Sequence, residues 1–231
     1  MTDLKILYRN EDFVVVDKPV DIAINAWDDE KHPVTVASIL KGIIPECADP
    51  SVKYNFRFVH RLDFSTSGTL CIALNKKAAS DLTKSFESRH IDKTYIALLM
   101  GRLDKEVTVE KPIGQHRRKP HKMVPNTDPN CVEQTVRDAK TQFTPVRYGF
   151  FLDTPVTKVQ IKLFTGRRHQ IRVHALTLGH PIFGDYTYTG AEEHARMYLH
   201  AKKLRIPYRG DTVEVESPID FDLDTVLEVY S

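Results

Sequence analysis

Several segments of the chain have the apolar pattern of strands. Residues 13–16 form an apolar run that ends at Asp-Lys-Pro, which suits a short strand because proline cannot donate to a sheet ladder. Residues 157–163 alternate apolar and polar positions, as expected of a strand with one wet face. The complete set of predicted strands is residues 13–16, 69–75, 94–101, 157–163, 197–206 and 212–217.

Three further segments have helical spacing, at residues 34–43, 76–90 and 167–179. The second follows Asn75, a residue favoured at the N-cap, and repeats apolar residues four apart. The third begins at Arg167 and stops at Gly179, where a left-handed residue is favoured after a helix. Because strands and helices are interspersed without a regular βαβ rhythm, the sequence predicts a mixed α+β fold.

Two stretches are predicted to lie outside these elements. Residues 56–63 look extended, and residues 65–68, Ser-Thr-Ser-Gly, supply turn residues before the strand at 69–75. Residues 111–130 combine prolines with several Lys, Arg and His residues, which predicts a mobile basic loop or insertion. Most such charge runs are simply solvated, but this one is the most obvious phosphate-facing segment of the chain.

Composition narrows the class of protein without naming a partner. The 231 residues include 33 Lys and Arg against 31 Asp and Glu, so the formal charge of +2 indicates no polyanionic ligand by itself. Three separated cysteines suggest neither a disulfide framework nor a zinc knuckle. No apolar run reaches a membrane span, and residues 1–13 resemble neither a signal peptide nor a transit peptide. We therefore expect a cytoplasmic protein, with the nucleus left open.

Candidate chemistry gathers in residues 60–68, His-Arg-Leu-Asp-Phe-Ser-Thr-Ser-Gly. Asp63 stands beside Arg61 and before a tight turn rich in hydroxyl groups. A carboxylate that acts as a nucleophile or base must stay ionised when partly buried, and a nearby guanidinium favours that form. A structural aspartate that caps a turn beside a surface arginine would give the same pattern.

Residues 60–68 resemble the signature HRLDxxTSG of the RluA-type pseudouridine synthases at every fixed position. Four further elements of that family follow in the right order: DKPV resembles KPxG, KTYIALLMG resembles KxYxALxxG, TGRRHQIRVHALTLGHPIFGD resembles TGRxHQIRxHxxxxGHPxxGD, and YLHAKKLRI resembles LHAxxL. Together the elements span residues 17–205. The resemblance implies an RNA-modifying isomerase that turns uridine into pseudouridine.

The family's catalytic aspartate corresponds to Asp63. The reaction breaks the C1'–N1 bond, rotates the uracil and joins C5 to C1', so one carboxylate suffices without a metal or coenzyme. Asp63 either attacks C1' as a nucleophile or removes a proton from the ribose C2', and the sequence leaves both open.

Three more residues take roles from the resemblance. Tyr95 corresponds to the tyrosine that stacks on the target uracil and is a candidate for taking the C5 proton. The alternative is a structural role, because a tyrosine in a strand is often part of the hydrophobic core. Arg167 corresponds to the cationic partner of the aspartate, and a helix start there would add donors for an anion. Arg61 corresponds to the wedge that fills the space of the extruded base. The alternative is that Arg61 only forms a salt bridge with Asp63.

The implied fold is one catalytic domain over residues 1–231, with no separate N-terminal RNA-binding domain. Its largely antiparallel central sheet is bent into two halves with flanking helices, and Asp63 lies in the cleft that they share. Two residues depart from the family pattern. Asp21 occupies a glycine position, and glycine at such a position serves a positive φ or a close approach of RNA. Thr69 replaces a leucine, which we interpret as packing variation.

The expected partner is RNA, with transfer or ribosomal RNA favoured, and its phosphates are expected at the basic loop. The residues for that role are Arg117, Arg118, Lys119 and Lys122. Metal binding is not expected, because His169 and His174 point about 140° apart in a helix. The alternative function is an RNA-binding or RNA-folding module with little catalysis. The RNA, the modified position and the oligomeric state cannot be read from the sequence.

Overall fold

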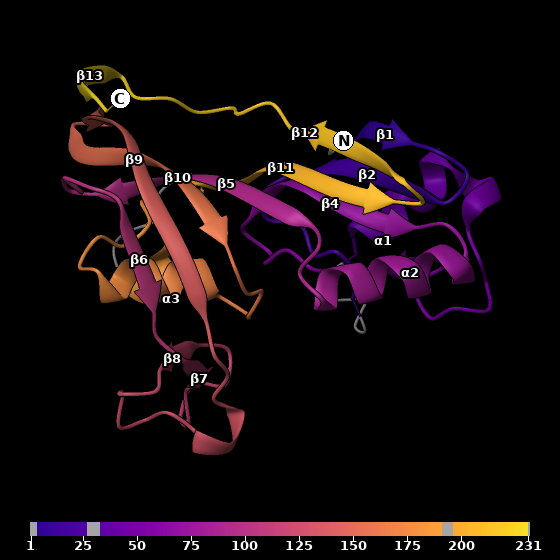
Figure 1. The fold of residues 1–231 in the computed structure, drawn as a ribbon, viewed down its shortest axis with the longest axis horizontal. Coiled ribbons are helices and arrows are strands. Elements are labelled where there is room, and N and C mark those ends of the chain that lie inside the picture. The colour runs from indigo at the N-terminus through magenta and orange to yellow at the C-terminus, as the bar shows by residue number, and fades with distance from the viewer. Residues whose placement is uncertain (1–3, 27–32, 191–195, 231) are drawn as a thin grey trace. The chain divides into compact units, whose positions relative to one another are not determined.

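The computed structural model describes residues 4–26, 33–190 and 196–230. The chain divides into two compact units, Met1–Lys93 with Ala201–Pro218, and Thr94–His200 with Ile219–Ser231. The strand ladders are antiparallel and the helices are few, so the fold is the predicted α+β class (Figure 1). In the described part of the chain, no helix combines the length and apolarity that crossing a bilayer requires.

The first unit is built on a sheet whose central strand is completely buried. Its strand order is β1-β2-β4-β11, with β3 beside β4 and β12 beside β11. Every residue of β4 is buried, which agrees with the continuous apolar run predicted there. The strands are β1 (Lys5–Arg9), β2 (Phe13–Lys18), β3 (Arg57–Phe58), β4 (Ser67–Ala73), β11 (Leu199–Tyr208, from Ala201 in this unit) and β12 (Asp211–Glu216).

Two α-helices accompany this sheet, α1 (Val36–Ile43) and α2 (Lys76–Glu87), with a short 3-10 turn η1 at Pro45–Cys47. Asn75 caps α2 as predicted, since its side chain accepts from the Ala78 amide over 2.8 Å. The apolar face of α2 packs on β4 and contributes Ala78 and Leu82 to the core (Figure 1). The helix ends at Glu87 rather than at residue 90. Arg89 adopts a left-handed conformation with φ 63°, which is incompatible with continuing a right-handed helix.

The second unit has the strand order β5-β10-β9-β13, with β6 beside β9. The sequence predicted β5 and β10 but missed β9. Buried positions of β9 alternate, yet two are Thr141 and Pro145, so the apolar period is hidden and a proline argues against a strand. The strands are β5 (Asp92–Met100, from Thr94 in this unit), β6 (Val107–Glu110), β9 (Lys140–Phe151), β10 (Thr154–Leu163) and β13 (Thr225–Val229).

Two helices and a small hairpin complete this unit. The helices are α3 (Gln170–Thr177) and α4 (Tyr186–Thr189), and a 3-10 turn η2 spans Glu133–Thr135. The basic segment 111–130, predicted as a loop, contains a two-stranded sheet of β7 (Ile113–Gln115) and β8 (Met123–Pro125). This hairpin extends beyond the ends of β6 and β9 (Figure 1) and packs on α3 through Ile113 and Val173.

Candidate active site

The segment between β3 and β4 carries two of the predicted site residues. Residues 59–66 pass from one strand to the next outside the ladder. The Thr66 amide donates to the Asp63 carbonyl over 3.1 Å and closes a tight turn. Arg61 is exposed, whereas Asp63 is half-buried. The segment therefore presents a guanidinium to solvent and keeps the carboxylate partly shielded.

Lys18, the last residue of β2, braces this turn. Its side chain is completely buried, and the ladder places it opposite Gly68 of β4. The ammonium donates to the carbonyls of Pro19, Phe64 and Thr66, each over 2.8 Å. Because a buried ammonium is tolerated only when its protons are accepted, these three bonds fix the path of the turn after Asp63.

His60 holds the other end of the segment. β3 stops after Phe58, and the His60 Nε2 atom then accepts the Cys71 amide of β4 over 2.8 Å. The ring stacks on Phe86 of α2 at 4.3 Å. Burial, with a smaller contribution from the Lys93 charge, lowers the pKa of His60 to about 3. The imidazole is therefore neutral and takes the place of a strand carbonyl where the chain leaves the sheet.

Both departures from the family pattern are accommodated by the first unit. Asp21 adopts a left-handed φ of 52°, the conformation for which a glycine is usual and which aspartate tolerates better than most residues. Thr69 is buried and its hydroxyl donates to the Ala201 carbonyl over 3.0 Å, so it is more than packing variation. Beside it, a Cβ on Gly68 would lie 2.2 Å from the same oxygen, which requires glycine there.

Tyr95 lies on β5 in the second unit, opposite Ile161 of β10. The side chain is buried, with 7% of its surface exposed. Its strand neighbours Ile96 and Leu98 belong to the apolar core of this unit, one residue and three residues along the strand. Because side chains alternate across a strand, Tyr95 projects to the opposite face of the sheet from that core.

Arg167 is exposed and precedes α3, which begins at Gln170. The predicted helix start at Arg167 is wrong because His169 is left-handed, with φ 55°, and caps the helix. The Arg167 amide donates to the Gln170 side-chain oxygen over 3.0 Å, so this amide is not offered to an anion. Its Nε atom donates to the Asp138 carbonyl over 3.1 Å, which orients the guanidinium.

Gln170 connects the turn before α3 to β9. Its oxygen also accepts the Thr165 hydroxyl over 2.7 Å, and its amide donates to the Lys140 carbonyl over 3.0 Å and the Thr141 hydroxyl over 2.9 Å. A buried amide whose hydrogen-bonding groups are all engaged has one orientation. This amide therefore fixes the backbone that carries Arg167.

The histidines of this region each bond within the chain. His174 contacts the Thr141 hydroxyl and the Lys111 carbonyl through its two ring nitrogens, both over 2.9 Å, and burial lowers its pKa. His169 bonds the Tyr188 hydroxyl over 2.8 Å, and His180 bonds the Met100 carbonyl over 2.9 Å. Over the described residues, no group of three or more His, Cys, Asp or Glu side chains is arranged to hold a metal ion.

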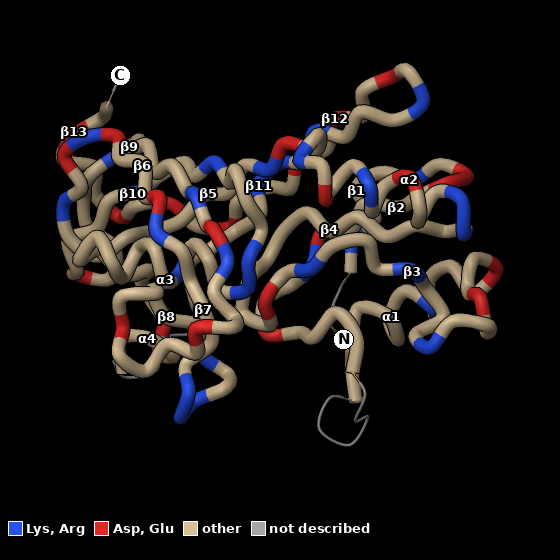
Figure 2. The backbone as a smooth tube through the Cα atoms, turned by 60° about the horizontal axis from the view of Figure 1, so that its bottom comes forward, with Lys and Arg blue, Asp and Glu red and all other residues tan. Residues whose placement is uncertain are grey.

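The basic hairpin ends in a cationic tip, which we define as residues 116–122. Arg117, Arg118 and Lys119 are exposed at this tip. Figure 2 shows Lys and Arg gathered where the tube projects beside β7 and β8. The exposed positions and their charge are suited to phosphate contact.

Tyr188 of α4 and Arg168, which precedes α3, anchor the base of this cationic tip. The Met123 amide donates to the Tyr188 hydroxyl over 2.9 Å, and the Lys122 ammonium lies 5.5 Å from the centre of the same ring. Arg168 donates to the Pro120 carbonyl over 2.6 Å. Lys122 is therefore half-buried and partly engaged within the chain, unlike the other three predicted RNA-binding residues.

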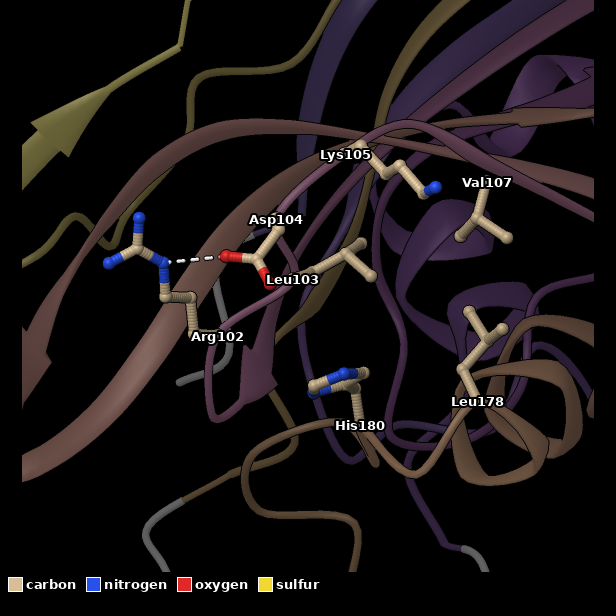
Figure 3. Close-up of a pocket in the computed structure, with 7 residues that line it drawn as sticks. All are labelled: Arg102, Leu103, Asp104, Lys105, Val107, Leu178 and His180. Atoms are coloured by element: carbon tan, nitrogen blue, oxygen red, sulfur yellow. Dashed lines mark hydrogen bonds and ion pairs between the residues drawn. The ribbon is translucent and has the colours of Figure 1, made fainter.

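A pocket of about 220 Å³ in the second unit is lined by none of the predicted site residues. Leu103, Val107 and Leu178 supply apolar walls, and the Arg102–Asp104 ion pair, 2.7 Å long, closes one side (Figure 3). Since none of the candidate residues lines it, the chemistry is not assigned to this pocket.

Sequence reasoning missed Lys18 and Gln170, the two residues that brace the candidate segments. Both are polar residues of types that are usually exposed, so periodicity treats them as surface positions. The available signal was their place within the DKPV and TGRRHQIR elements, but a motif match does not indicate that a side chain turns inward.

Comparison with known proteins gives a consistent result. A family model described as RNA pseudouridylate synthase matches residues 12–177. Human RNA pseudouridylate synthase domain-containing protein 1 is 41% identical over 228 residues, which cover 95% of this chain and 72% of that protein. The Escherichia coli dual-specificity RNA pseudouridine synthase RluA is 34% identical over 225 residues, which cover 94% of each. A solved structure titled Human RNA Pseudouridylate Synthase Domain Containing 1 has a TM-score of 0.84 at 36% identity, covering 99% of this chain and 91% of that chain.

Replacing Lys18 with methionine tests the brace. The apolar side chain removes the ammonium but leaves the Phe64 and Thr66 carbonyls buried, so we expect the free energy of unfolding to fall by about 2–4 kcal/mol. Urea denaturation measures it. Lys41→Met on the exposed face of α1 is the matched control and should stay within about 0.5 kcal/mol of the unsubstituted protein. Equal effects of the two substitutions would contradict the brace.

His60→Gln tests the neutral imidazole. The folded-state pKa of His60, about 3, lies below the ordinary 6.5, so its contribution is fully present above pH 6.5 and is lost as pH falls toward 3. Glutamine can accept the Cys71 amide without titrating. The free energy of unfolding, measured by urea denaturation between about pH 7 and pH 5, should therefore fall less in the variant, by up to about 1.4 kcal/mol per pH unit. His174 also has a lowered pKa, but it is present in both proteins and its contribution to the pH dependence cancels in the comparison. Parallel pH profiles would therefore exclude this role for His60.

Proposed function

Because the chain belongs to the RNA pseudouridylate synthase family, we propose that it isomerises uridine in transfer or ribosomal RNA with Asp63 as the catalytic carboxylate. The family makes the protein an isomerase of the RluA type that acts on RNA. The choice of RNA and the assignment of Asp63 are the proposed part.

The observation that carries the role of Asp63 is the bracing of its turn by Lys18. Catalytic groups are effective when the surrounding structure holds them in place before the substrate arrives. The turn after Asp63 is fixed by two carbonyls bonded to one buried ammonium, and the segment before it is fixed by His60. A carboxylate that merely caps a surface turn would not need this support.

The chemistry requires one well-placed carboxylate and no net redox change. The C1'–N1 bond breaks, the uracil rotates, C5 bonds to C1', C5 loses its proton and N1 gains one. Asp63 begins the reaction by attack on C1' or by removal of the C2' proton, and both routes need it ionised. The scheme uses neither a metal nor a coenzyme.

Arg61, Tyr95 and Arg167 complete the proposed set. Arg61 is exposed, as a side chain that replaces an extruded base must be, and its planar guanidinium can stack while it bonds phosphate. Tyr95 stacks on the target uracil and receives the C5 proton in this proposal. Arg167 binds either Asp63 or an RNA phosphate, with its guanidinium oriented by the Asp138 carbonyl.

The cationic tip is proposed to bind RNA phosphates through Arg117, Arg118, Lys119 and Lys122. Three of these are exposed, and the base of the tip is held by Tyr188 of α4 and by Arg168 before α3, in addition to its two strands. Anchoring matters because a contact made by an ordered segment loses less conformational entropy on binding.

Asp63→Asn tests the proposed function directly. The substitution keeps the size of the side chain and removes its charge, so we expect pseudouridine formation to fall by at least about 10³-fold. The measurement is pseudouridine mapping of RNA from cells that carry only the variant. The sites that disappear identify the substrate. Asp21→Asn, which keeps a residue that tolerates positive φ, is the matched control and should preserve every site. If Asp63→Asn protein is folded and no site is lost, the protein acts as an RNA-binding module instead.

Neutralising Arg117, Arg118 and Lys119 as glutamines tests the cationic tip. Each lost phosphate contact should reduce the dependence of log affinity on log salt by about 0.7–0.9, so the slope should fall by about 2–3 for the triple variant. Filter binding to the mapped RNA over a range of salt concentrations measures it.

The control for this variant removes the same charge elsewhere. Lys41, Lys76 and Lys77 are exposed on α1 and α2 of the first unit, and their replacement by glutamine should leave the salt slope within about 0.5 of the unsubstituted value. Equal slopes for both triple variants would mean that net charge, rather than the tip, drives RNA binding.

A further inference from the structure

The residue after the proposed catalytic carboxylate is an exposed aromatic. Phe64 has 44% of its surface exposed. Two residues away on either side the chain is buried, since Leu62 is 6% and Thr66 is 2% exposed. Phe64 and Arg61 are therefore the two exposed side chains of residues 59–66, and Phe64 is the aromatic one.

The backbone beneath this ring is fixed. The Phe64 carbonyl accepts from the Lys18 ammonium over 2.8 Å, and the Asp63–Thr66 turn encloses the residue. A side chain on such a backbone retains only its rotamer freedom. Binding through its ring therefore loses less entropy than binding through a loose loop.

Exposure alone does not identify a site, since single apolar residues are common on protein surfaces. Other aromatic rings are also exposed, including Phe150 at 37% and Tyr186 at 58%, and both belong to the second unit. Phe64 differs because it is next to Asp63 in the chain and three residues after the exposed Arg61. Any RNA placed with its target at Asp63 brings the adjoining nucleotides close to this ring.

Single-stranded nucleotides are recognised mainly by stacking on aromatic side chains and by Arg. Once a uridine leaves the stack, the nucleotide beside it also loses a stacking face, and a phenyl ring can restore one. Resting on the proposed function, we propose that Phe64 stacks on the nucleobase adjacent to the target uridine and makes the enzyme select for an unpaired purine there. A purine is expected because its larger face stacks more strongly than that of a pyrimidine.

The first test is a substitution series at Phe64 with the transcript of a site identified by mapping. Phe64→Leu keeps an apolar side chain but removes the aromatic face, and we expect KM to rise roughly 10-fold with kcat nearly unchanged. Phe64→Tyr and Phe64→Trp should restore KM. Phe150→Leu, at a comparably exposed aromatic, is the matched control and should leave both constants unchanged.

The second test removes the base instead of the ring. Transcripts with an abasic nucleotide on the 5' or the 3' side of the target should raise KM for the unsubstituted protein on one side only. On that side Phe64→Leu should add no further loss, because the two changes delete the same contact. Additive losses on both sides would overturn the proposal.

Fluorescence gives a readout that a merely structural role would not change. The chain contains one tryptophan, and Phe64→Trp adds a second. In the Asp63→Asn background, RNA should quench the added fluorescence more with an intact neighbour than with an abasic one, and equal quenching counts against stacking.

The two proposals fail separately. If Asp63→Asn leaves pseudouridine in place, the proposed function is wrong. If Asp63→Asn abolishes it while Phe64→Leu matches the unsubstituted protein on every transcript, only the stacking role is wrong.

Discussion

The buried ammonium of Lys18 is the constraint on which the proposed catalytic segment depends. One donor group satisfies three carbonyls, two of them in the turn that follows Asp63. An apolar contact would permit small shifts of that turn, whereas hydrogen bonds in a low-dielectric interior weaken steeply with distance and angle. Gly68 adds to the constraint, since its missing side chain lets β4 approach the Ala201 carbonyl. The position of Asp63 thus follows from interactions made by residues that do no chemistry.

The second unit uses the same kind of support for its own candidate residue. The Gln170 side chain ties the turn of Arg167 to β9, and α3 is held further by a buried ion pair between Arg172 and Asp185, with contacts of 2.6 and 2.7 Å. Their side chains are 7% and 2% exposed. Such a pair contributes little net stability compared with apolar packing, because desolvation offsets its attraction. The ion pair instead sets an orientation, because a bidentate guanidinium contact fixes how α3 lies against the start of α4.

Sequence analysis succeeded where one physical signal dominated. The continuous apolar run of β4 and the Asn75 cap of α2 both appear in the structure as predicted. The strand β9 was missed because its buried face includes Thr141 and Pro145, and the start of α3 was misplaced because His169 adopts a left-handed conformation. For the site, the resemblance supplied the candidate residues but not their support. Whether a lysine in a motif turns inward depends on carbonyls contributed 46 and 48 residues later, which no local pattern contains.

The residues that position Asp63 differ from those that are proposed to select the RNA. Lys18, which braces the turn after Asp63, is completely buried, so replacing it disturbs the packing of the first unit. Phe64 and the cationic tip are exposed, and their side chains can change without disturbing those buried bonds, because Lys18 contacts only the backbone carbonyl of Phe64. A substitution at Phe64 therefore changes what the ring can contact and leaves the turn in place. If the proposed roles hold, such a chain can acquire a new RNA preference through exposed residues while the bonds that position Asp63 stay unchanged.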